Sequence, residues 1–169
     1  MELTIRPASV DDHLSVHEIL MSPHVLRGTM RVPQSPVVQT RERLTPARGV
    51  IQLVAEDAGE IVGFAELITH PDDPRERHAG EINLVAVRES SLGKGVGKAL
   101  CAELVDLADN WLNLTRLGLV VFEGNGRAIG IYERLGFTHE GTMRRFGFGD
   151  GTWMDAHMMG RIRPSPPPA

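Results

Sequence analysis

The stretch LGKGVGKAL, at residues 92–100, contains the residue types that point most directly to chemistry. Gly93, Gly95 and Gly97 stand where a strand passes into a run of apolar residues at helical spacing, and therefore at a helix N-terminus. The run consists of Val96, Leu100, Leu104, Leu107 and Trp111. Glycines there leave successive backbone N–H groups accessible, and the helix dipole favours an anion. The stretch therefore predicts a site for a phosphate-bearing ligand, and a pyrophosphate would fit it.

Two common nucleotide-binding motifs do not match this stretch. A P-loop would have its first glycine where Leu92 stands and a hydroxyl-bearing residue where Ala99 stands. A dinucleotide fingerprint would need a third glycine in place of Leu100. The sequence thus disfavours nucleoside triphosphates and dinucleotides. Lys94 and Lys98 add positive charge at the rim, although lysines in such positions are more often only solvated.

Two blocks of sequence, with a predicted strand between them, carry a family resemblance. The first is the glycine stretch with the strand that leads into it, and the second is NGRAIGIYERLGF at residues 125–137. They resemble the R/Q-x-x-G-x-G/A and N-x-x-A-x-x-x-Y-x-x-x-G-F motifs of the GNAT superfamily of acetyl-CoA-dependent N-acetyltransferases. The resemblance implies that backbone amides hold the pyrophosphate of acetyl-CoA at Leu92, Gly93, Lys94, Gly95, Val96, Gly97 and Lys98.

Leu92 departs from the family pattern, which has Arg or Gln at this position. Because main-chain N–H groups do most of the anion binding, we expect the departure to weaken or alter the binding of the anion slightly and not to abolish it. The resemblance is good from the hairpin at Val50 to Phe137 and weaker in the N-terminal segment.

The resemblance also implies roles for the strand before the loop and for the start of the second block. In the family this strand diverges from its neighbour, so the N–H groups of Val85, Ala86 and Val87 are expected to pair with the pantetheine arm and the thioester carbonyl. One such donor to developing charge contributes about 2.7–4 kcal/mol. Asn125 is expected to hydrogen-bond the pantetheine arm, and capping of a helix would explain it equally well.

Tyr132 and Glu81 are the predicted catalytic residues. Tyr132 is the only tyrosine and stands at the position of the family's general acid, which protonates the departing CoA thiolate. Glu81 begins the strand that leads to the loop, where a glutamate acts as general base through a water molecule in many relatives. A solvated strand-end carboxylate is the alternative reading. His78 and His139 have a suitable intrinsic pKa but no motif support.

The acceptor amine is less clearly specified. The segments around the second block and the end of the chain resemble a bacterial subgroup that acetylates the α-amino group of amino acids or their derivatives. We therefore expect a small primary amine of amino-acid or peptide-like type. A protein N-terminus or lysine, a polyamine, and a non-catalytic acetyl-CoA-binding module are the alternatives.

The acceptor pocket is expected between residues 22–36, residues 70–80 and the last hairpin. An amino acid would need a cation for its carboxylate, and the candidates are Arg27, Arg31 and Arg75. A polyamine would prefer acidic groups, and the candidates are Asp72, Asp73 and Glu76. The sequence does not choose between these two sets.

Composition excludes several other functions. The chain has 169 residues, a net charge of −4 and no long apolar run, so we expect a soluble cytoplasmic protein that binds neither nucleic acid nor membrane. The basic residues at 41–48 and 144–145 are expected to be solvated. No metal is predicted, since the pair His13 and His17 lacks a third ligand, and Cys101 is expected to be a buried bystander. A homodimer is expected from family analogy alone.

The pattern of apolar residues predicts seven strands and two crossover helices after a first helix capped by Asp11 and Asp12. The strands are expected near residues 2–8, 50–57, 60–69, 80–87, 116–122, 137–146 and 153–162, and the main helices near 14–21, 96–111 and 125–135. This order implies an α/β (α+β) fold of GNAT type, with a mixed, mostly antiparallel twisted sheet of about seven strands and about four helices. Residues 1–163 are expected to form one domain, followed by a disordered Pro-rich tail at 164–169.

Overall fold

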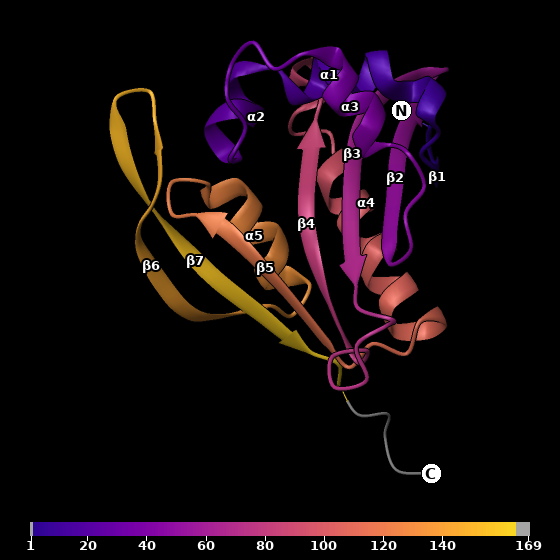
Figure 1. The fold of residues 1–169 in the computed structure, drawn as a ribbon, viewed down its shortest axis with the longest axis vertical. Coiled ribbons are helices and arrows are strands. Elements are labelled where there is room, and N and C mark those ends of the chain that lie inside the picture. Colours follow the sequence, from indigo (N-terminus) through magenta and orange to yellow (C-terminus); the bar gives the residue numbers. More distant parts are fainter. Residues whose placement is uncertain (1, 165–169) are drawn as a thin grey trace.

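The computed structural model describes residues 2–164, which form one seven-stranded sheet with helices on both faces (Figure 1). The strands are β1 (Leu3–Pro7), β2 (Val50–Asp57), β3 (Glu60–Thr69), β4 (Ala79–Val87), β5 (Arg116–Phe122), β6 (Thr138–Gly149) and β7 (Thr152–Ile162). The helices are α1 (His13–Leu20), α2 (Pro23–Gly28), α3 (Val37–Arg43), α4 (Val96–Asp106) and α5 (Gly126–Arg134). Of the tail predicted to be disordered, all but Pro164 lies outside the described residues.

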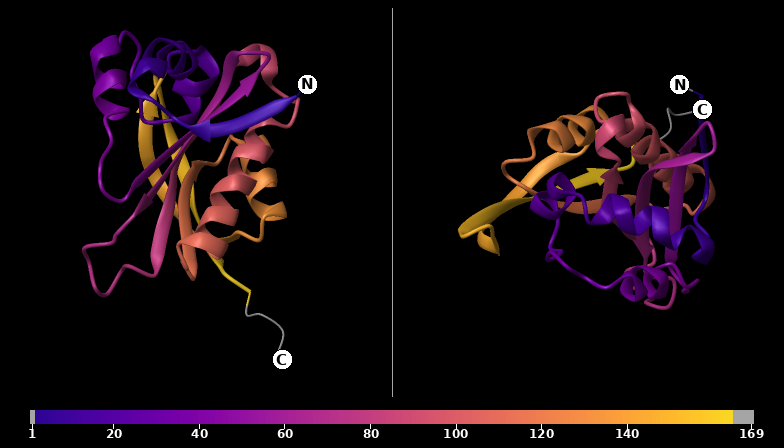
Figure 2. Two further views of the ribbon diagram at one scale, coloured as in Figure 1. Left: turned by 90° about the vertical axis from the view of Figure 1, so that its right-hand side faces the viewer. Right: turned by 90° about the horizontal axis from the view of Figure 1, so that it is seen from above.

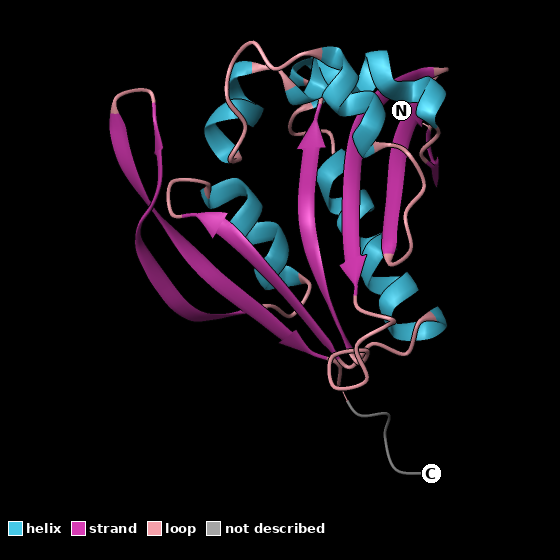
Figure 3. Ribbon diagram, in the orientation of Figure 1, coloured by secondary structure: helices cyan, strands magenta, loops and turns pink. Residues whose placement is uncertain are grey.

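The sheet has the strand order β1-β2-β3-β4-β5-β7-β6, and all neighbours are antiparallel except β4 and β5. The parallel pairing is short, since it joins only Ala79–Glu81 to Arg116–Gly118. Beyond these residues the two strands diverge and the sheet opens into a V (Figure 3). The predicted fold class is confirmed, and the V is the feature that positions the site.

Helices cover both faces of the sheet (Figure 2), and each face carries an apolar layer. Helices α4 and α5 pack on one face through residues such as Leu100 and Leu104, and α1 packs on the other face through Val16 and Ile19. Helix α4 lies close to β3, because a Cβ on Gly63 would stand 2.7 Å from Val96 Cγ1. This close packing places the N-terminus of α4 beside the open end of β4.

The local predictions for the hairpin turn and for the cap of the first helix have different outcomes in the structure. The predicted hairpin turn between β2 and β3 is confirmed, with positive φ at Ala58 (50°) and Gly59 (82°). The predicted cap of the first helix is confirmed in position only. Asp12 is the N-cap residue of α1, but its side chain makes no capping hydrogen bond there. It instead completes a capping box with Ser9 at the 3-10 turn Val10–Asp12, which precedes α1. Helices α2 and α3 lie within residues 22–45, where three prolines predict loops with short, weak helices.

Candidate functional site

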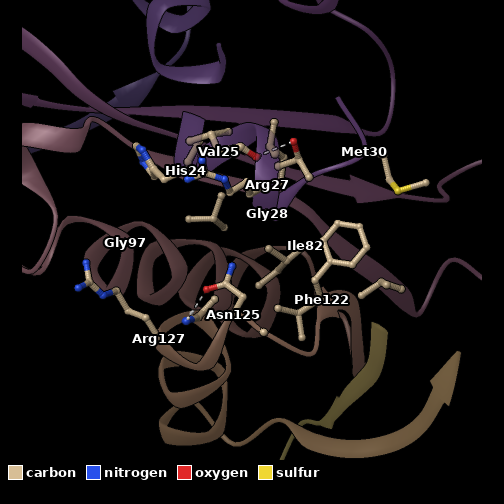
Figure 4. A pocket seen from close by; sticks show the side chains of 18 of the residues that line it. His24, Val25, Arg27, Gly28, Met30, Ile82, Gly97, Phe122, Asn125 and Arg127 are labelled. Carbon is tan, nitrogen blue, oxygen red and sulfur yellow. Dashed lines mark hydrogen bonds between the residues drawn. The ribbon is translucent and has the colours of Figure 1, made fainter. Parts of the chain in front are cut away.

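A continuous cavity of about 1090 Å³ passes through the V between β4 and β5 (Figure 4). At one end it is lined by the glycine stretch and helix α5, with Leu92, Gly97, Asn125, Ala128, Ile131 and Tyr132. At the other end it is lined by the segment after α2, by α3 and by the β6–β7 hairpin, with Thr29, Met30, Arg31, Arg43, Phe146, Trp153 and Met154. Residues 82–87 of β4 form the wall that joins the two ends.

The glycine stretch has the backbone geometry of an anion cradle. Gly93 (φ 78°) and Gly95 (φ 89°) adopt left-handed conformations, and Gly95 is the N-cap of α4 without any side-chain cap. Within residues 2–164, no acceptor is bound by the N–H groups of Gly93, Gly95, Val96, Gly97 and Lys98. A Cβ on Gly93 or Gly95 would meet no protein atom within 4 Å, so the surface around these two glycines is open. The stretch can therefore hold a diphosphate with its main chain.

Side chains of the stretch divide between core and rim. Val96 is buried against the sheet, Leu92 lines the cavity, and Lys94 and Lys98 are exposed. The lysines thus stand at the rim, where their charge adds to the potential that the amides create.

The edge of β4 that faces the V presents unpaired hydrogen-bonding groups. Arg88 N–H donates to the Val62 carbonyl at 2.8 Å, and because antiparallel partners alternate, Val85 and Val87 direct their N–H and C=O groups away from β3. The pairing with β5 ends at Glu81, so both N–H groups open into the cavity. Ala86, by the same alternation, directs its N–H group toward β3.

His24 of α2 also contacts this edge, and no sequence pattern indicates it. Its Nε2 donates to the Val87 carbonyl at 2.8 Å, across 63 residues of sequence. The Nδ1 atom of the same ring is buried without a hydrogen-bond partner among the described residues. The bond fixes α2 over the open end of β4 and removes one acceptor from the free edge.

Tyr132 of α5 lines the cavity and is almost fully buried, at 8% exposed. Its ring packs edge-on against Phe137 at 5.8 Å between centroids. Burial raises the pKa of its phenol, so the group is protonated at neutral pH and can donate a proton. Burial also raises the pKa of the neighbouring Cys101 thiol to about 12, which keeps this side chain from acting as a nucleophile.

Asn125 caps α5 and, among the described residues, keeps its amide donor free at the cavity. Its Oδ1 accepts from Ala128 N–H at 3.3 Å and so caps α5. Its Nδ2 donates to no group within residues 2–164 and lines the cavity, which leaves this donor for a ligand. Gly28 at the end of α2 lies opposite, since a Cβ there would stand 3.4 Å from Nδ2, and the cavity is narrow at this point (Figure 4).

Glu81 is not brought together with these residues. It is exposed and lines a smaller cavity of about 260 Å³, together with the ion-paired Arg116 and Glu140. Asn83 and Val120 line both cavities, so the smaller one adjoins the main one. The carboxylates that line the main cavity itself are Glu123 and Asp155, and neither His78 nor His139 lines it.

The acceptor end of the cavity rests on a buried charge cluster. Glu66 of β3, only 3% exposed, accepts from Arg43 Nη2 (2.7 Å), Arg43 Nε (3.1 Å), Gln52 Nε2 (2.7 Å) and Asn83 Nδ2 (2.6 Å). Burial opposes its ionisation, but these hydrogen bonds and the charge of Arg43 lower the pKa of Glu66 below its usual value. The prediction that the basic residues at 41–48 are all solvated was therefore wrong for Arg43.

The predicted borders of the acceptor pocket are confirmed in part. The segment at 22–36 and the β6–β7 hairpin line the cavity, but no residue of the loop at 70–80 does so, which removes Arg75 as a candidate there. Figure 1 shows this loop at the opposite end of the sheet from α2. The acidic candidates for a polyamine site lie on the same loop and are equally remote: Asp72, Asp73 and Glu76.

Aromatic and methionine side chains form an apolar wall at the acceptor end, which the sequence patterns above do not predict. The rings of Phe122 and Phe146 pack at a tilt, with 6.1 Å between centroids, and Trp153 and Met30 line the same end of the cavity. The hairpin and the segment after α2 meet at this wall, because a Cβ on Gly147 would stand 2.9 Å from the Phe122 ring and 3.3 Å from Met30 Sδ. The available signal was the set of aromatic residues around the turn of the last hairpin.

Residues 2–164 contain neither a metal-ligand cluster nor a helix that could span a membrane. No group of three or more His, Cys, Asp or Glu side chains among residues 2–164 is placed to hold a metal ion. No helix in the same range is long and apolar enough to cross a membrane.

Comparison with known proteins connects this geometry to a family. The model of the acetyltransferase (GNAT) family matches residues 14–137. The L-amino acid N-acetyltransferase AaaT of Escherichia coli is 33% identical over 162 residues, covering 96% of this chain and 99% of the relative. The phosphinothricin N-acetyltransferase of Alcaligenes faecalis is 30% identical, covering 89% and 78%. The crystal structure of a phosphinothricin acetyltransferase from Sinorhizobium meliloti, in complex with AcCoA, superposes with a TM-score of 0.82 at 28% identity, covering 96% and 89%.

Proposed function

The chain belongs to the GNAT family and is an acetyl-CoA-dependent N-acetyltransferase, and from this premise we propose that it acetylates the primary amine of a small molecule of amino-acid type. One observation carries the proposal. A single cavity joins a cradle of unpaired amides to a chamber lined by arginine and aromatic side chains. Cofactor and acceptor can therefore meet within the V from opposite ends.

The residues at the first end fit acetyl-CoA. The unpaired amides of Gly93, Gly95, Val96, Gly97 and Lys98 match a diphosphate, and Asn125 Nδ2 together with the free edge of β4 matches the amide groups of a pantetheine arm. The surface around Gly95 is open, which leaves room for a ligand. The N–H groups of Leu92 and Lys94 donate to the carbonyls of Glu89 and Ser91, so Leu92 contributes only an apolar side chain, where the family motif has Arg or Gln.

Acetyl-CoA supplies an activated acetyl group as a thioester, and we assign the remaining chemistry to this chain. The N–H groups of Val85 and Val87 point into the gap and can donate to the thioester oxygen as it gains negative charge. Nitrogen forms the new bond to the acetyl carbon, the carbon–sulfur bond breaks, and Tyr132 gives its proton to the departing thiolate. We propose that Glu81 takes the amine's proton through a water molecule in the adjoining smaller cavity.

Two observations favour an amino acid over a polyamine as the acceptor. The acidic candidates Asp72, Asp73 and Glu76 lie outside the cavity, and arginines outnumber carboxylates in its lining. The arginines are Arg27, Arg31, Arg43 and Arg127, and the carboxylates are Glu123 and Asp155. The relatives named above point the same way, because one acts on L-amino acids and the other on phosphinothricin.

The first test is an acceptor screen. The purified protein is mixed with acetyl-CoA and with amino acids, dipeptides, polyamines or aminoglycosides, and free thiol is followed. We expect turnover on amino acids and a loss of about 10²–10⁴-fold in kcat for Tyr132→Phe, with binding of acetyl-CoA retained. Tight acetyl-CoA binding without thiol release on any of these amines would refute the proposal and would favour a protein substrate or a non-catalytic module.

Assembly and location are separate proposals. We expect a homodimer in the cytoplasm, by analogy with the family alone. Light scattering coupled to gel filtration measures the mass directly, and a mass of one chain at working concentrations would refute the dimer.

A further inference from the structure

We propose that Arg31 is the residue that selects acceptors with a free α-carboxylate, by pairing with that carboxylate at the end of the cavity. The inference rests on the proposed function and adds to it the group that distinguishes an amino acid from any other small amine. It draws on three features of the structure: the charge balance around Glu66, the state of the Arg31 side chain, and the position of its backbone.

The cluster around Glu66 leaves Arg31 unpaired, and the carboxylates of the cavity lining, Glu123 and Asp155, form no ion pair with it among residues 2–164. Glu66 is saturated by four hydrogen bonds, two of them from Arg43, so this pair is neutral and its carboxylate has no capacity for another cation. Arg31 lines the same end of the cavity, within electrostatic range of both groups. His17, the other titratable side chain facing this cluster, has its pKa lowered by burial and by Arg31 and therefore adds little positive charge at neutral pH.

Arg31 itself is a partly buried cation without a counter-ion. Among residues 2–164 its guanidinium makes no hydrogen bond and no ion pair, although the side chain is only partly exposed. Burial lowers the pKa of Arg31, and the charge of Arg43 adds to this effect while Glu66 opposes it. A guanidinium that has lost water without gaining a partner is costly, and an anionic ligand would remove this cost.

The backbone of Arg31 is held in place before any ligand binds. Thr29 Oγ1 accepts from Arg31 N–H at 3.4 Å and donates to the Val25 carbonyl at 2.8 Å, which ties the segment to the last turn of α2. Helix α2 is in turn fixed to β4 through His24. The guanidinium therefore stands on a segment that is anchored to the catalytic strand.

The chemistry of the chamber matches the three substituents of an α-amino acid. The amine has to reach the gap at Val85, the planar carboxylate can form two parallel hydrogen bonds with Arg31, and an apolar side chain can lie on the wall formed by Phe146 and Trp153. A polyamine or a lysine side chain would bring a second positive charge or no charge to the same position, and Arg31 would remain unpaired.

The test compares three acceptors that differ only at the carboxylate: L-phenylalanine, L-phenylalaninamide and 2-phenylethylamine. We expect the wild-type protein to prefer the acid over the amide by about 10- to 100-fold in kcat/KM. Arg31→Gln should lower kcat/KM for the acid alone, so that the preference falls to about threefold or less, and Arg31→Lys should restore part of it. In each variant, kcat/KM for the acid is divided by kcat/KM for the amide. The amine pKa values of the two acceptors are the same in every variant, so their effect cancels when these ratios are compared.

Arg41→Gln is the matched control, since Arg41 lies on α3 but is exposed and outside the cavity. An equal loss on all three acceptors in Arg31→Gln, or a preference for the acid that survives the substitution, would overturn the inference and leave the proposed function standing. Calorimetry of L-phenylalanine with the CoA-bound protein separates the remaining cases. If no amine is acetylated, binding that depends on Arg31 supports the inference while the proposed function fails, and an absence of binding overturns both.

Discussion

Gly95→Ala separates the cofactor role of the glycine stretch from its structural role. Gly95 has a φ of 89° and no protein atom within 4 Å of a Cβ built on it, so the substitution brings backbone strain without a steric clash. A non-glycine residue in this conformation costs about 1–2 kcal/mol, and the lower entropy of the unfolded chain offsets about half of this. We expect a loss of about 1 kcal/mol, or about 2–4 °C in Tm for a chain of this size.

The effect on acetyl-CoA should be much larger than the effect on stability. The new methyl group would stand in open space beside the unpaired amides, where the diphosphate is expected. Losing one or two charge-assisted hydrogen bonds corresponds to about 10- to 100-fold in affinity. The assay is the KM for acetyl-CoA at saturating acceptor, together with the Kd from calorimetry.

Gly59→Ala is a matched control within the same chain. Gly59 has a φ of 82° in the β2–β3 turn and likewise has nothing within 4 Å of a Cβ, so it should lose the same stability with an unchanged KM. If Gly95→Ala binds acetyl-CoA as tightly as Gly59→Ala does, the stretch is not the diphosphate cradle. If the two variants differ by several kcal/mol in stability, the strain argument is wrong.

Two further predictions concern carboxylates. Glu81→Gln should lower kcat by about 10²–10⁴-fold, as measured at saturating acetyl-CoA and acceptor; an unchanged kcat would transfer the role of base to Asp155 or another group of the main cavity. Glu66→Gln leaves Arg43 without its counter-ion and should cost about 2–3 kcal/mol in denaturant unfolding at neutral pH. Because the folded pKa of Glu66 is lowered, wild-type stability from this group is present above its ordinary pKa and is lost as pH falls through the folded value. The variant should therefore show a weaker loss of stability in acid, and an equal acid sensitivity would contradict the assignment.

Those parts of the site that depend on local backbone chemistry could be predicted from the sequence. The glycine stretch is readable because positive φ and a helix N-terminus leave a signature within a few residues, and the turn at Ala58 and Gly59 is readable for the same reason. The position of Tyr132 in the cavity follows from a motif that spans one helix. Each of these features is determined by neighbours in sequence.

The acceptor end could not be predicted, because it depends on contacts between distant segments. The bond from His24 to Val87 spans 63 residues, and the Arg43–Glu66 pair spans 23. A sequence pattern gives no reason to separate Arg43 from the exposed basic residues around it. The loop at 70–80 was placed at the pocket because it precedes β4, but β4 runs from that loop toward the site, so the loop lies at the far end of the strand.

The free edge of β4 explains why such an open sheet can serve a cofactor without recruiting another strand. An unpaired strand edge offers alternating N–H and C=O groups and invites β-addition. Here His24 occupies the Val87 carbonyl, so the edge keeps the donors of Val85 and Val87 but loses one of its two acceptors. A peptide strand would then leave a donor unsatisfied in the gap, whereas a ligand rich in carbonyl oxygens pairs with what remains. His24→Ala would free that carbonyl, and we infer that the edge would then lose its selectivity for acceptor-rich ligands.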